Sequence, residues 1–378
     1  MQQVRFGIVG VGNMGSAHLA HILSGNVPEL KVTAVADISP ARLEAAKKAA
    51  EQAGQPVETF SSASALFNSG LCDAVIIATP HYDHPPLVIE ALAHKLHVIT
   101  EKPAGVYTKQ VREMNEAAAK SDKIFAVMFN QRTNHIYRKM KELVGSGKYG
   151  EIRRTNWIIT DWFRCQSYYN SGGWRATWAG EGGGVLLNQC PHNLDLWQWI
   201  CGMPSKVRAF CKEGHFHEIE VEDDVTAYVE YPNGATGVFI STTGEFPGTN
   251  RFEIVLDRAT ILCENGKLSV FELKDSQQHF IDTCPEGFGR MDGCFIDIET
   301  DGENPQHDGV LRAFAAAILR GEPLIARGEE GINGLTLSNA MFLSSWLNET
   351  VTLPLDEDLF YAELKKRIDS SKAKKESK

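Results

Sequence analysis

The first 130 residues alternate between short apolar runs and segments in which apolar residues recur at helical spacing. The apolar runs are typical of strands buried on both faces, and the segments between them are typical of amphipathic helices. This alternation predicts a parallel, doubly wound α/β sheet with helices on both faces. The expected strands are Phe6–Val9, Val32–Ala36, Ala74–Ala78, His97–Thr100 and Ile124–Phe129. The expected helices are Met14–Leu23, Pro40–Ala53, Ser62–Asn68, Pro86–His94 and Lys109–Ser121.

After about Lys148 the pattern changes to longer strands that follow one another through short turns. The clearest hairpin joins Asp224–Tyr231 to Ala235–Thr243 through Pro-Asn-Gly. Further strands are expected at Phe252–Leu256, Ala259–Glu264 and Lys267–Glu272, and helices at Val310–Arg320 and Gly331–Leu347. The second part is therefore expected to be an α+β domain with a large, mostly antiparallel sheet. The predicted domains are 1–130 and 131–360, followed by a charged tail, 361–378, whose last nine residues we expect to be disordered.

Composition excludes several classes of protein. Hydrophobic residues make up 43% of the 378 residues, charged residues 23%, and the formal net charge is −10. Neither nucleic acid nor an anionic membrane attracts a net anion, so neither is an expected partner. No apolar run approaches the ~20 residues needed to span a bilayer. The first strand begins within a few residues of Met1, which leaves no room for a signal peptide, and a cytoplasmic protein is expected.

The cysteines and histidines do not form a recognisable metal motif. The eight cysteines contain no CxxC pair, which favours scattered, reduced thiols over a disulfide framework or a zinc site. The segment His215–Glu218, HFHE, offers no second set of ligands and is interpreted as a solvated loop. No metal site is predicted.

A dinucleotide fingerprint follows the first strand. The pattern is GxGxxG, with glycines at Gly10, Gly12 and Gly15 and with Asn13 and Met14 between the last two. It lies at the start of the first expected helix. The three glycines suit a tight turn, close approach of backbone to a pyrophosphate, and close packing of helix on strand, as in a Rossmann domain.

The residue after the second strand bears on the choice of nucleotide. Asp37 ends that strand, where a carboxylate would bind a ribose 2′-OH and repel a 2′-phosphate. NAD is therefore the expected cofactor, although the nearby Arg42 keeps NADP possible.

The segment Gly182–Trp197 places three polar side chains in an otherwise apolar run. Asn188, His192 and Asp195 are spaced i, i+4 and i+7, so on a helix they would share one face. A histidine between two acceptors is suited to hold one tautomer and to move one proton. The alternative is a buried histidine satisfied by its neighbours. If the helix instead begins at Pro191, Asn188 lies on the preceding loop.

Two strand ends carry polar residues to the carboxyl edge of the predicted parallel sheet, where ligands bind in such folds. The fourth strand ends in Glu101-Lys102-Pro103, and the third is followed by Thr79-Pro80-His81-Tyr82-Asp83-His84. Spacing alone leaves Lys102 equally suited to a surface salt bridge and to a ligand site.

Four motifs in this order resemble the Gfo/Idh/MocA family, named for glucose–fructose oxidoreductase, inositol dehydrogenase and a rhizopine catabolism protein. They are GxGxxG at Gly10–Gly15, TPxxxH at Thr79–His84, EKP at Glu101–Pro103 and GGGxLLNQxxHxxD at Gly182–Asp195. The motifs span roughly residues 1–200, and the later antiparallel sheet is similar to the family's second domain.

The resemblance implies a two-domain NAD(P)-dependent sugar or polyol oxidoreductase. It implies that Lys102 lies beside nicotinamide and the substrate hydroxyl, that His192 is the general acid/base, and that Lys102–Pro103 is a candidate cis bond. It also implies that Thr79, Pro80, His84, Glu101 and Asn130 lie on the cofactor side.

The chain departs from the family at Asn188, where many dehydrogenases have Asp. A neutral amide can hydrogen-bond but cannot favour an imidazolium as a carboxylate does. Asn188 is thus a candidate either to orient His192 or to contact the substrate. Asp195 is the remaining carboxylate near His192, either as its orienting group or as a buried cap.

Aromatic and arginine residues are concentrated just before the Gly182 motif, where four of the seven tryptophans lie between residues 157 and 178. Flat rings suit the C–H faces of a pyranose, and arginine suits hydroxyls or carboxylates. The alternative is that these rings pack under a loop or at a subunit interface. The candidate substrate-binding residues are Trp162, Arg164, Tyr168, Trp174, Arg175, Asn188 and His192.

The expected activity is hydride transfer between NAD and a secondary ring hydroxyl, or ketone, of a sugar, glycoside or cyclitol, catalysed by Lys102, His192 and Asn188. One alternative is an NAD-dependent glycosidase that oxidises the sugar transiently and eliminates the aglycone. Another is a non-catalytic nucleotide-sensing regulator, against which the presence of both Lys102 and His192 argues. The family's antiparallel sheet commonly pairs with another subunit, so a homodimer or homotetramer is expected.

Overall fold

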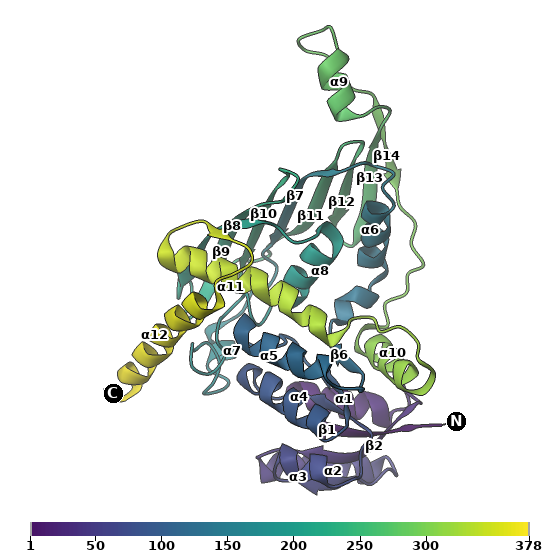
Figure 1. Cartoon of the computed structure of the whole chain (residues 1–378), viewed down its shortest axis with the longest axis vertical. Coiled ribbons are helices and arrows are strands. Elements are labelled where there is room, and N and C mark those ends of the chain that lie inside the picture. The colour runs from purple at the N-terminus through teal and green to yellow at the C-terminus, as the bar shows by residue number, and fades with distance from the viewer. Residues whose placement is uncertain (1, 377–378) are drawn as a thin grey trace. The chain divides into compact units, whose positions relative to one another are not determined.

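The computed structural model describes residues 2–376 and divides the chain into two compact units (Figure 1). The first unit comprises 1–133 and 304–335, and the second comprises 134–303 and 336–378. The division after Thr133 lies close to the expected boundary at residue 130. The segment 304–335 was expected in the second domain and instead belongs to the first.

The first unit contains a six-stranded parallel sheet in the order β3-β2-β1-β4-β5-β6. This is the doubly wound order whose direction reverses between β1 and β4, and it confirms the predicted Rossmann architecture. The five predicted strands are present, and β3 is an addition. The strands are β1 Val4–Val9, β2 Leu30–Ala36, β3 Glu58–Phe60, β4 Ala74–Ile77, β5 His97–Thr100 and β6 Phe125–Val127. The helices are α1 Asn13–Leu23, α2 Pro40–Gln52, α3 Ala63–Asn68, α4 His84–Ala93, α5 Thr108–Ala119 and α10 Gln306–Arg320, with 3-10 turns η1 His81–Asp83, η2 Asn130–Thr133 and η3 Gly328–Glu330.

Helix α10 explains why the chain returns to the first unit. Its apolar residues Val310, Leu311 and Phe314 are buried in the same core as Phe6 and other residues of β1 and β2. The rings of Phe6 and Phe314 meet edge to face at 6.4 Å. An amphipathic helix pattern shows that a face is buried but does not show which sheet buries it.

The second unit is built on a nine-stranded sheet in the order β14-β13-β12-β11-β7-β10-β9-β8-β15. Every neighbouring pair is antiparallel except β7 and β10, which confirms the mostly antiparallel sheet. Its strands are β7 Ile152–Ile159, β8 Lys206–Glu213, β9 Glu222–Glu230, β10 Thr236–Thr242, β11 Asn250–Leu256, β12 Ala259–Glu264, β13 Lys267–Leu273, β14 Gly293–Asp297 and β15 Val351–Thr352. Its helices are α6 His135–Gly145, α7 Gln166–Tyr169, α8 Pro191–Cys201, α9 Gln277–Thr283, α11 Gly331–Leu347 and α12 Glu357–Glu376, and the division between units falls inside α11.

Helices α6 and α8 lie against one face of this sheet (Figure 1). Tyr137 of α6 packs on Trp157 of β7, and Trp197 of α8 stacks on Phe239 of β10. Trp157 is itself stacked on Phe252 at 4.2 Å between ring centroids. This aromatic layer forms the core of the unit.

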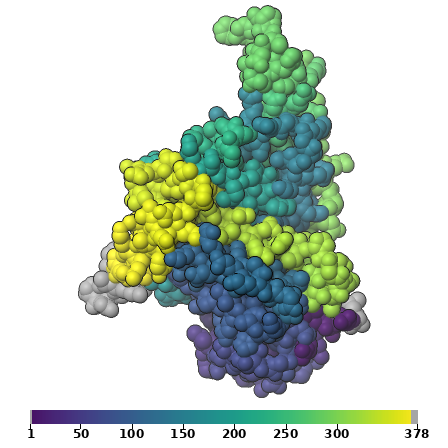
Figure 2. All heavy atoms as spheres, viewed as in Figure 1, coloured from purple at the N-terminus to yellow at the C-terminus, as the bar shows by residue number. Residues whose placement is uncertain are grey.

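Two segments differ from the sequence prediction at the periphery. Helix α12 continues to Glu376, so the expected tail boundary at residue 361 falls inside a helix; residues 377–378 lie outside the described part. Helix α9 has no buried residue, and Phe288 after it is 98% exposed. The space-filling view shows this green segment protruding from its unit (Figure 2).

A buried carboxylate–histidine pair links α1 to the end of β5. The Oε1 atom of Glu101 lies 2.6 Å from Nε2 of His18, and both side chains are at most 5% exposed. Burial raises the pKa of Glu101, but the hydrogen bond and charge of His18, with the charges of Lys102 and His307, outweigh it and lower the pKa to about 2. The carboxylate is therefore ionised and also accepts the backbone N–H of Lys102 at 3.2 Å.

Removing His18 should leave the Glu101 carboxylate buried without its partner. Loss of one member of a buried pair costs about 3–5 kcal/mol, so His18→Ala should lower the free energy of unfolding by about that amount at neutral pH. The native carboxylate stabilises the fold above its unfolded pKa of 4.5, and this contribution is lost as pH falls towards 2. The difference between His18→Ala and the native protein should therefore narrow in acid.

Urea unfolding of both proteins across this pH range measures the difference. His279→Ala, on the exposed helix α9, is the matched control and should leave stability unchanged. Equal stability of His18→Ala and the native protein at neutral pH would contradict the assignment.

The sheet face opposite α6 and α8 generates a second prediction. Tyr228 is 41% exposed there, and its neighbours Ile158, Val238 and Ile240 are only half-buried. We propose that a second copy covers this face, because an apolar surface of this kind is seldom left to water. Light scattering should give the molecular mass of a dimer or tetramer for the native protein. Ile240→Glu should lower that mass, because a charge on this face would disfavour association. A native mass of 41.8 kDa would refute the proposal; Ala41→Glu on α2 is the control.

Candidate active site

The glycine loop after β1 leaves the N-terminus of α1 open. Gly10 has φ +86°, and a Cβ there would lie 2.7 Å from the carbonyl oxygen of Ala78. A Cβ on Gly15 would overlap the carbonyl oxygen of Gly10, so this glycine permits the close packing of α1 on β1. A Cβ on Gly12 would lie 3.8 Å from Nη1 of Arg42, an ordinary contact, and Gly12 caps α1 without a side-chain hydrogen bond. Asn13 begins the helix and Met14 is 37% exposed.

The acid expected at the end of β2 lies against this loop. Oδ2 of Asp37 accepts the N–H of Val11 at 2.9 Å, and Oδ1 accepts that of Ser39 at 2.8 Å. Nη1 of Arg42 lies 3.8 Å from the same carboxylate, and the Arg42 side chain is 59% exposed. Arg42, the residue that made NADP binding possible in the sequence analysis, thus lies beside Asp37, the carboxylate that disfavours NADP.

His84 joins two loops at the carboxyl edge of the parallel sheet. Its ring is buried, with Nε2 2.8 Å from the carbonyl oxygen of Thr79 and Nδ1 2.8 Å from that of Pro103. Pro80 precedes η1 in the first loop, and the Lys102–Pro103 bond of the second is cis, as expected. His84 thus holds the two loops together, and its predicted place on the cofactor side stays a prediction. Lys102 itself is half-buried.

The residues of the first unit are arranged in a way that fits a bound dinucleotide. The uncapped N-terminus of α1 presents N–H groups where a pyrophosphate binds. Oγ1 of Thr79 and Oδ1 of Asn130 are buried without a hydrogen-bond partner in this structure, although the amide nitrogen of Asn130 donates to Gln306. Both residues follow strands at the edge where such ligands bind, and unpaired buried polar atoms are costly unless a ligand or water satisfies them.

In the second unit, a buried glutamate shapes the Gly182 motif. Glu222 of β9 is fully buried, and its two oxygens accept the N–H groups of Gly184 and Leu186, each at 2.8 Å. Burial raises the pKa of Glu222 to about 8, against the lowering effect of these hydrogen bonds. A Cβ on Gly184 would overlap the carbonyl oxygen of Glu222, so the motif needs glycine to lie this close to β9.

Helix α8 begins at Pro191, so Asn188, His192 and Asp195 do not share one helical face as the spacing suggested. Asn188 lies on the preceding turn, where its N–H donates to the carbonyl oxygen of Gly184. His192 is in the first turn of α8 and is half-buried. Asp195 is 1% exposed and accepts Nε2 of Gln198 at 3.0 Å, one turn further on. Proline at the first helical position sets this boundary.

Asn188 contacts a carboxylate that the sequence analysis missed. Its amide nitrogen donates to Oε1 of Glu181, a 2% exposed side chain whose Oε2 accepts the N–H of Ala176 at 2.7 Å. The amide oxygen of Asn188 accepts the hydroxyl of Tyr168 at 3.3 Å. Arg175 donates to that hydroxyl at 2.7 Å and lies 3.7 Å from Glu181. The carboxyl group that is lacking at residue 188 is therefore present on the neighbouring side chain, Glu181.

The aromatic and arginine residues before this motif are brought together in part. The guanidinium of Arg164 lies over the rings of Trp162 and Tyr168, and that of Arg175 lies over Tyr168 and Trp174. Trp162 and Tyr168 are half-buried. Five of the seven predicted substrate residues thus form one cation–π cluster in the second unit.

The HFHE segment is exposed at residues 215, 216 and 218, as expected for a solvated loop, and differs from that prediction only at His217. The ring of His217 is only 7% exposed and lies 2.8 Å from both Asp223 and the carbonyl oxygen of Arg164. Asp223 also accepts the N–H groups of residues 215, 216 and 217. Within the segment, His217 is therefore a buried contact to the backbone of Arg164 in the cluster. Within residues 2–376, no group of three His, Cys, Asp or Glu is placed to hold a metal ion, and all eight cysteines are free thiols.

Two of the residues missed by the sequence analysis, His18 and Glu222, are ionisable groups paired across a long sequence separation. His18 lies 83 residues from Glu101, and Glu222 lies 36 residues from Leu186. The one local signal was the short spacing of Glu181 before Asn188. Across the part of the chain that the structure describes, no helix combines the length and apolar character needed to cross a membrane.

Two family models match the two parts of the chain. Residues 4–129 match the oxidoreductase family with an NAD-binding Rossmann fold, and residues 137–262 match the GFO/IDH/MocA C-terminal domain.

Several similar proteins are named dehydrogenases. The myo-inositol 2-dehydrogenase of Thermotoga maritima is 25% identical over 368 residues, 94% of this chain and 99% of that protein. The D-glucoside 3-dehydrogenase of Escherichia coli is 28% identical over 252 residues, 61% of this chain and 68% of that protein. The WlbA dehydrogenase of Chromobacterium violaceum, solved with NADH and UDP-GlcNAcA, has a TM-score of 0.80 at 28% identity and covers 94% of this chain and 97% of that one. With its two matched domains, the chain belongs to the Gfo/Idh/MocA family of oxidoreductases.

Proposed function

We propose that this protein is an NAD-dependent dehydrogenase that oxidises a secondary ring hydroxyl of a sugar, glycoside or cyclitol, or reduces the corresponding ketone. The observation that carries the proposal is the placement of Lys102 at the carboxyl edge of a Rossmann sheet whose glycine loop is open. His192, in the first turn of α8 of the second unit, supplies the proton-transfer group. Relatives named for inositol and D-glucoside oxidation support the substrate class.

The first unit supplies the cofactor side of this reaction. The N-terminus of α1, with Gly10–Gly15, would hold the pyrophosphate, and Asp37 would accept a ribose hydroxyl. Thr79, Asn130 and Glu101 complete the cofactor side together with Lys102. Bound NAD would supply the acceptor for the hydride that leaves the carbinol carbon.

The chain's own residues handle the proton and the developing charge. We assign His192 as the base that takes the hydroxyl proton, and the Lys102 ammonium as the hydrogen-bond donor that stabilises the oxygen as it becomes negative. The backbone N–H of Lys102 donates a hydrogen bond to the ionised Glu101 carboxylate, and this hydrogen bond fixes the position of the Lys102 backbone. Asn188 would orient the substrate or His192, and its hydrogen bond to the Glu181 side chain would hold the Asn188 amide in place.

The substrate side is the cation–π cluster of the second unit. Half-buried Trp162 and Tyr168 offer ring faces for the C–H face of a pyranose. Trp174, Arg164 and Arg175 hold these rings, and the arginine N–H groups not bonded within the cluster are available to hydroxyls.

NAD should bind more tightly than NADP, because the Asp37 carboxylate repels a 2′-phosphate. Asp37→Ala should narrow the gap between the two dissociation constants. Arg42→Ala should weaken NADP more than NAD, since its guanidinium lies beside Asp37. Calorimetric titration of the purified protein with both nucleotides measures these constants, and tighter NADP binding by the native protein would overturn the prediction.

A turnover screen of sugars, glycosides and cyclitols with NAD, followed by NADH absorbance, tests the activity itself. On the substrate found, Lys102→Met and His192→Ala should each lower kcat by roughly 10²–10⁴-fold, with little change in NAD affinity. Their effects should be non-additive because both groups act on one oxygen. Lys120→Met and His279→Ala, both exposed, are the matched controls.

Three outcomes of this experiment contradict the proposal in different ways. Near-native turnover of His192→Ala would show that another group is the base. Release of aglycone without accumulation of NADH would identify the glycosidase that works by transient oxidation. Tight NAD binding with no turnover of any sugar would favour a nucleotide-sensing regulator.

A further inference from the structure

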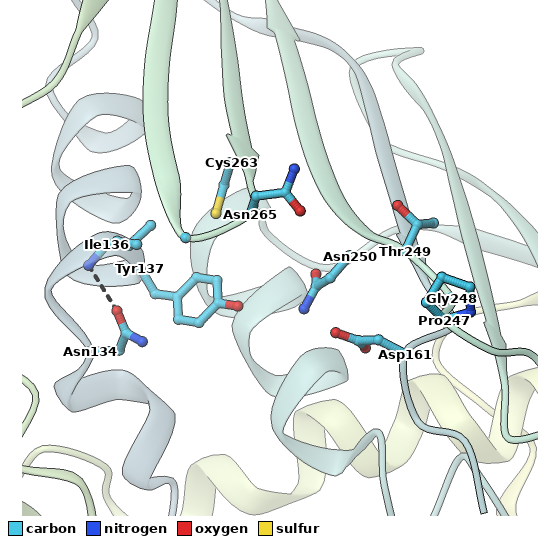
Figure 3. A pocket seen from close by; sticks show the side chains of 11 residues that line it. Asn134, Ile136, Tyr137, Asp161, Pro247, Gly248, Thr249, Asn250, Cys263 and Asn265 are labelled. Atoms are coloured by element: carbon cyan, nitrogen blue, oxygen red, sulfur yellow. Dashed lines mark hydrogen bonds between the residues drawn. The ribbon is translucent and has the colours of Figure 1, made fainter.

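A polar pocket of about 540 Å³ lies wholly within the second unit (Figure 3). It is formed by the start of α6, the segment after β7, the segment that leads into β11, and the end of β12 with the turn to β13. Its volume is within the ~300–1,000 Å³ typical of small-molecule sites. The lining residues are Asn134, Ile136, Tyr137, Asp161, Pro247, Gly248, Thr249, Asn250, Cys263, Asn265 and Gly266.

Neighbouring groups fix the direction of two of its amides. Oδ1 of Asn250 accepts the indole N–H of the fully buried Trp157 at 3.1 Å, so its NH₂ group is turned towards Asp161, whose pKa it lowers. Oδ1 of Asn134 accepts the N–H of Ile136 at 2.9 Å as the N-cap of α6, which leaves its NH₂ group for another partner. Hydrogen bonds within the protein therefore fix the orientation of the amide NH₂ groups that can donate into the pocket.

Asp161 is the charged group of this lining. Burial raises the pKa of Asp161, and the hydrogen bond from Asn250 opposes that effect. In Figure 3 its carboxylate and the hydroxyl of Tyr137 approach the same space from opposite sides. No Lys or Arg belongs to the lining, so a phosphate or other anion would meet a carboxylate without a compensating cation.

These groups suit a neutral, hydroxyl-rich molecule. A carboxylate accepts hydrogen bonds from neighbouring hydroxyls, and amide NH₂ groups donate to hydroxyl and ring oxygens. The Tyr137 ring, supported by Trp157, offers an apolar face for C–H groups. Asp161 also directly precedes Trp162, the first residue of the cation–π cluster.

We propose that this pocket binds a neutral saccharide unit, namely the non-reacting ring of a glycoside or disaccharide substrate. The assignment of that ring to a substrate rests on the proposed dehydrogenase function, whereas saccharide binding by the pocket does not. Such a subsite would make the enzyme prefer two-ring substrates to free monosaccharides and would disfavour sugar phosphates.

Calorimetry without NAD tests the pocket independently of turnover. Maltose and cellobiose are the probes, with glucose 1-phosphate as the anionic comparison. At least one neutral disaccharide should bind the full-length protein, and glucose 1-phosphate should bind more weakly. Asp161→Asn should weaken the disaccharide about 10-fold or more, as expected for loss of a charge-assisted hydrogen bond. Asp282→Asn, on the exposed helix α9, is the matched control. Tyr137→Phe, which keeps the ring but removes the hydroxyl, should weaken binding less.

Kinetics then connect the pocket to the reaction. On a two-ring substrate, Asp161→Asn should raise KM at least several-fold and leave kcat unchanged, while KM for a one-ring substrate should not move. Unchanged disaccharide affinity in Asp161→Asn, or tighter binding of glucose 1-phosphate than of both disaccharides, would overturn the inference. If no sugar is oxidised but Asp161-dependent disaccharide binding is measured, the proposed function fails and the saccharide site stands.

Discussion

The ionised carboxylate of Glu101 is buried in the interior of the first unit. The position of the Lys102 backbone depends on this buried carboxylate. A charge so deeply buried is tolerated only when it is paired, and His18 on α1 provides the pair. The second oxygen holds the backbone of Lys102. One interaction therefore connects the helix that begins at the glycine loop with the strand end that carries the lysine.

In the second unit, buried glutamate side chains hold the loop before α8 through hydrogen bonds. Glu222 accepts hydrogen bonds from two backbone N–H groups of the glycine-rich motif, and Glu181 accepts one from the side-chain amide of Asn188. Backbone donors of an irregular turn must find acceptors when they are buried, and a carboxylate from a neighbouring strand satisfies two at once. An aspartate at residue 188 would instead place two carboxylates in contact, so Asn188 and Glu181 are chemically matched.

The polar groups of the second unit fall into two sets with different chemistry. The cation–π cluster around Tyr168 presents aromatic faces and guanidinium groups, which suit a ring and its hydroxyls. The pocket around Asp161 presents amides, a phenol and a carboxylate without a cation. Two such surfaces are more than a single small polyol requires, and they are consistent with a larger neutral carbohydrate.

The sequence by itself determined the order of elements in the first unit, because buried parallel strands and amphipathic helices leave distinct apolar periods. It also determined the antiparallel character of the second sheet, since hairpin turns such as Pro232-Asn233-Gly234 have local chemistry. The positions of Gly10–Gly15, Asp37 and Lys102 at strand ends followed from the same patterns and motifs.

Only the tertiary structure decided which polar groups pair. His18 with Glu101, Glu181 with Asn188 and His217 with Asp223 depend on where helices and strands pack, and α10 joins the first unit for the same reason. The helical face assumed for Asn188, His192 and Asp195 was wrong because Pro191 begins α8. Periodicity reports that a side chain is buried, whereas its partner is set by non-local packing, which no local pattern encodes.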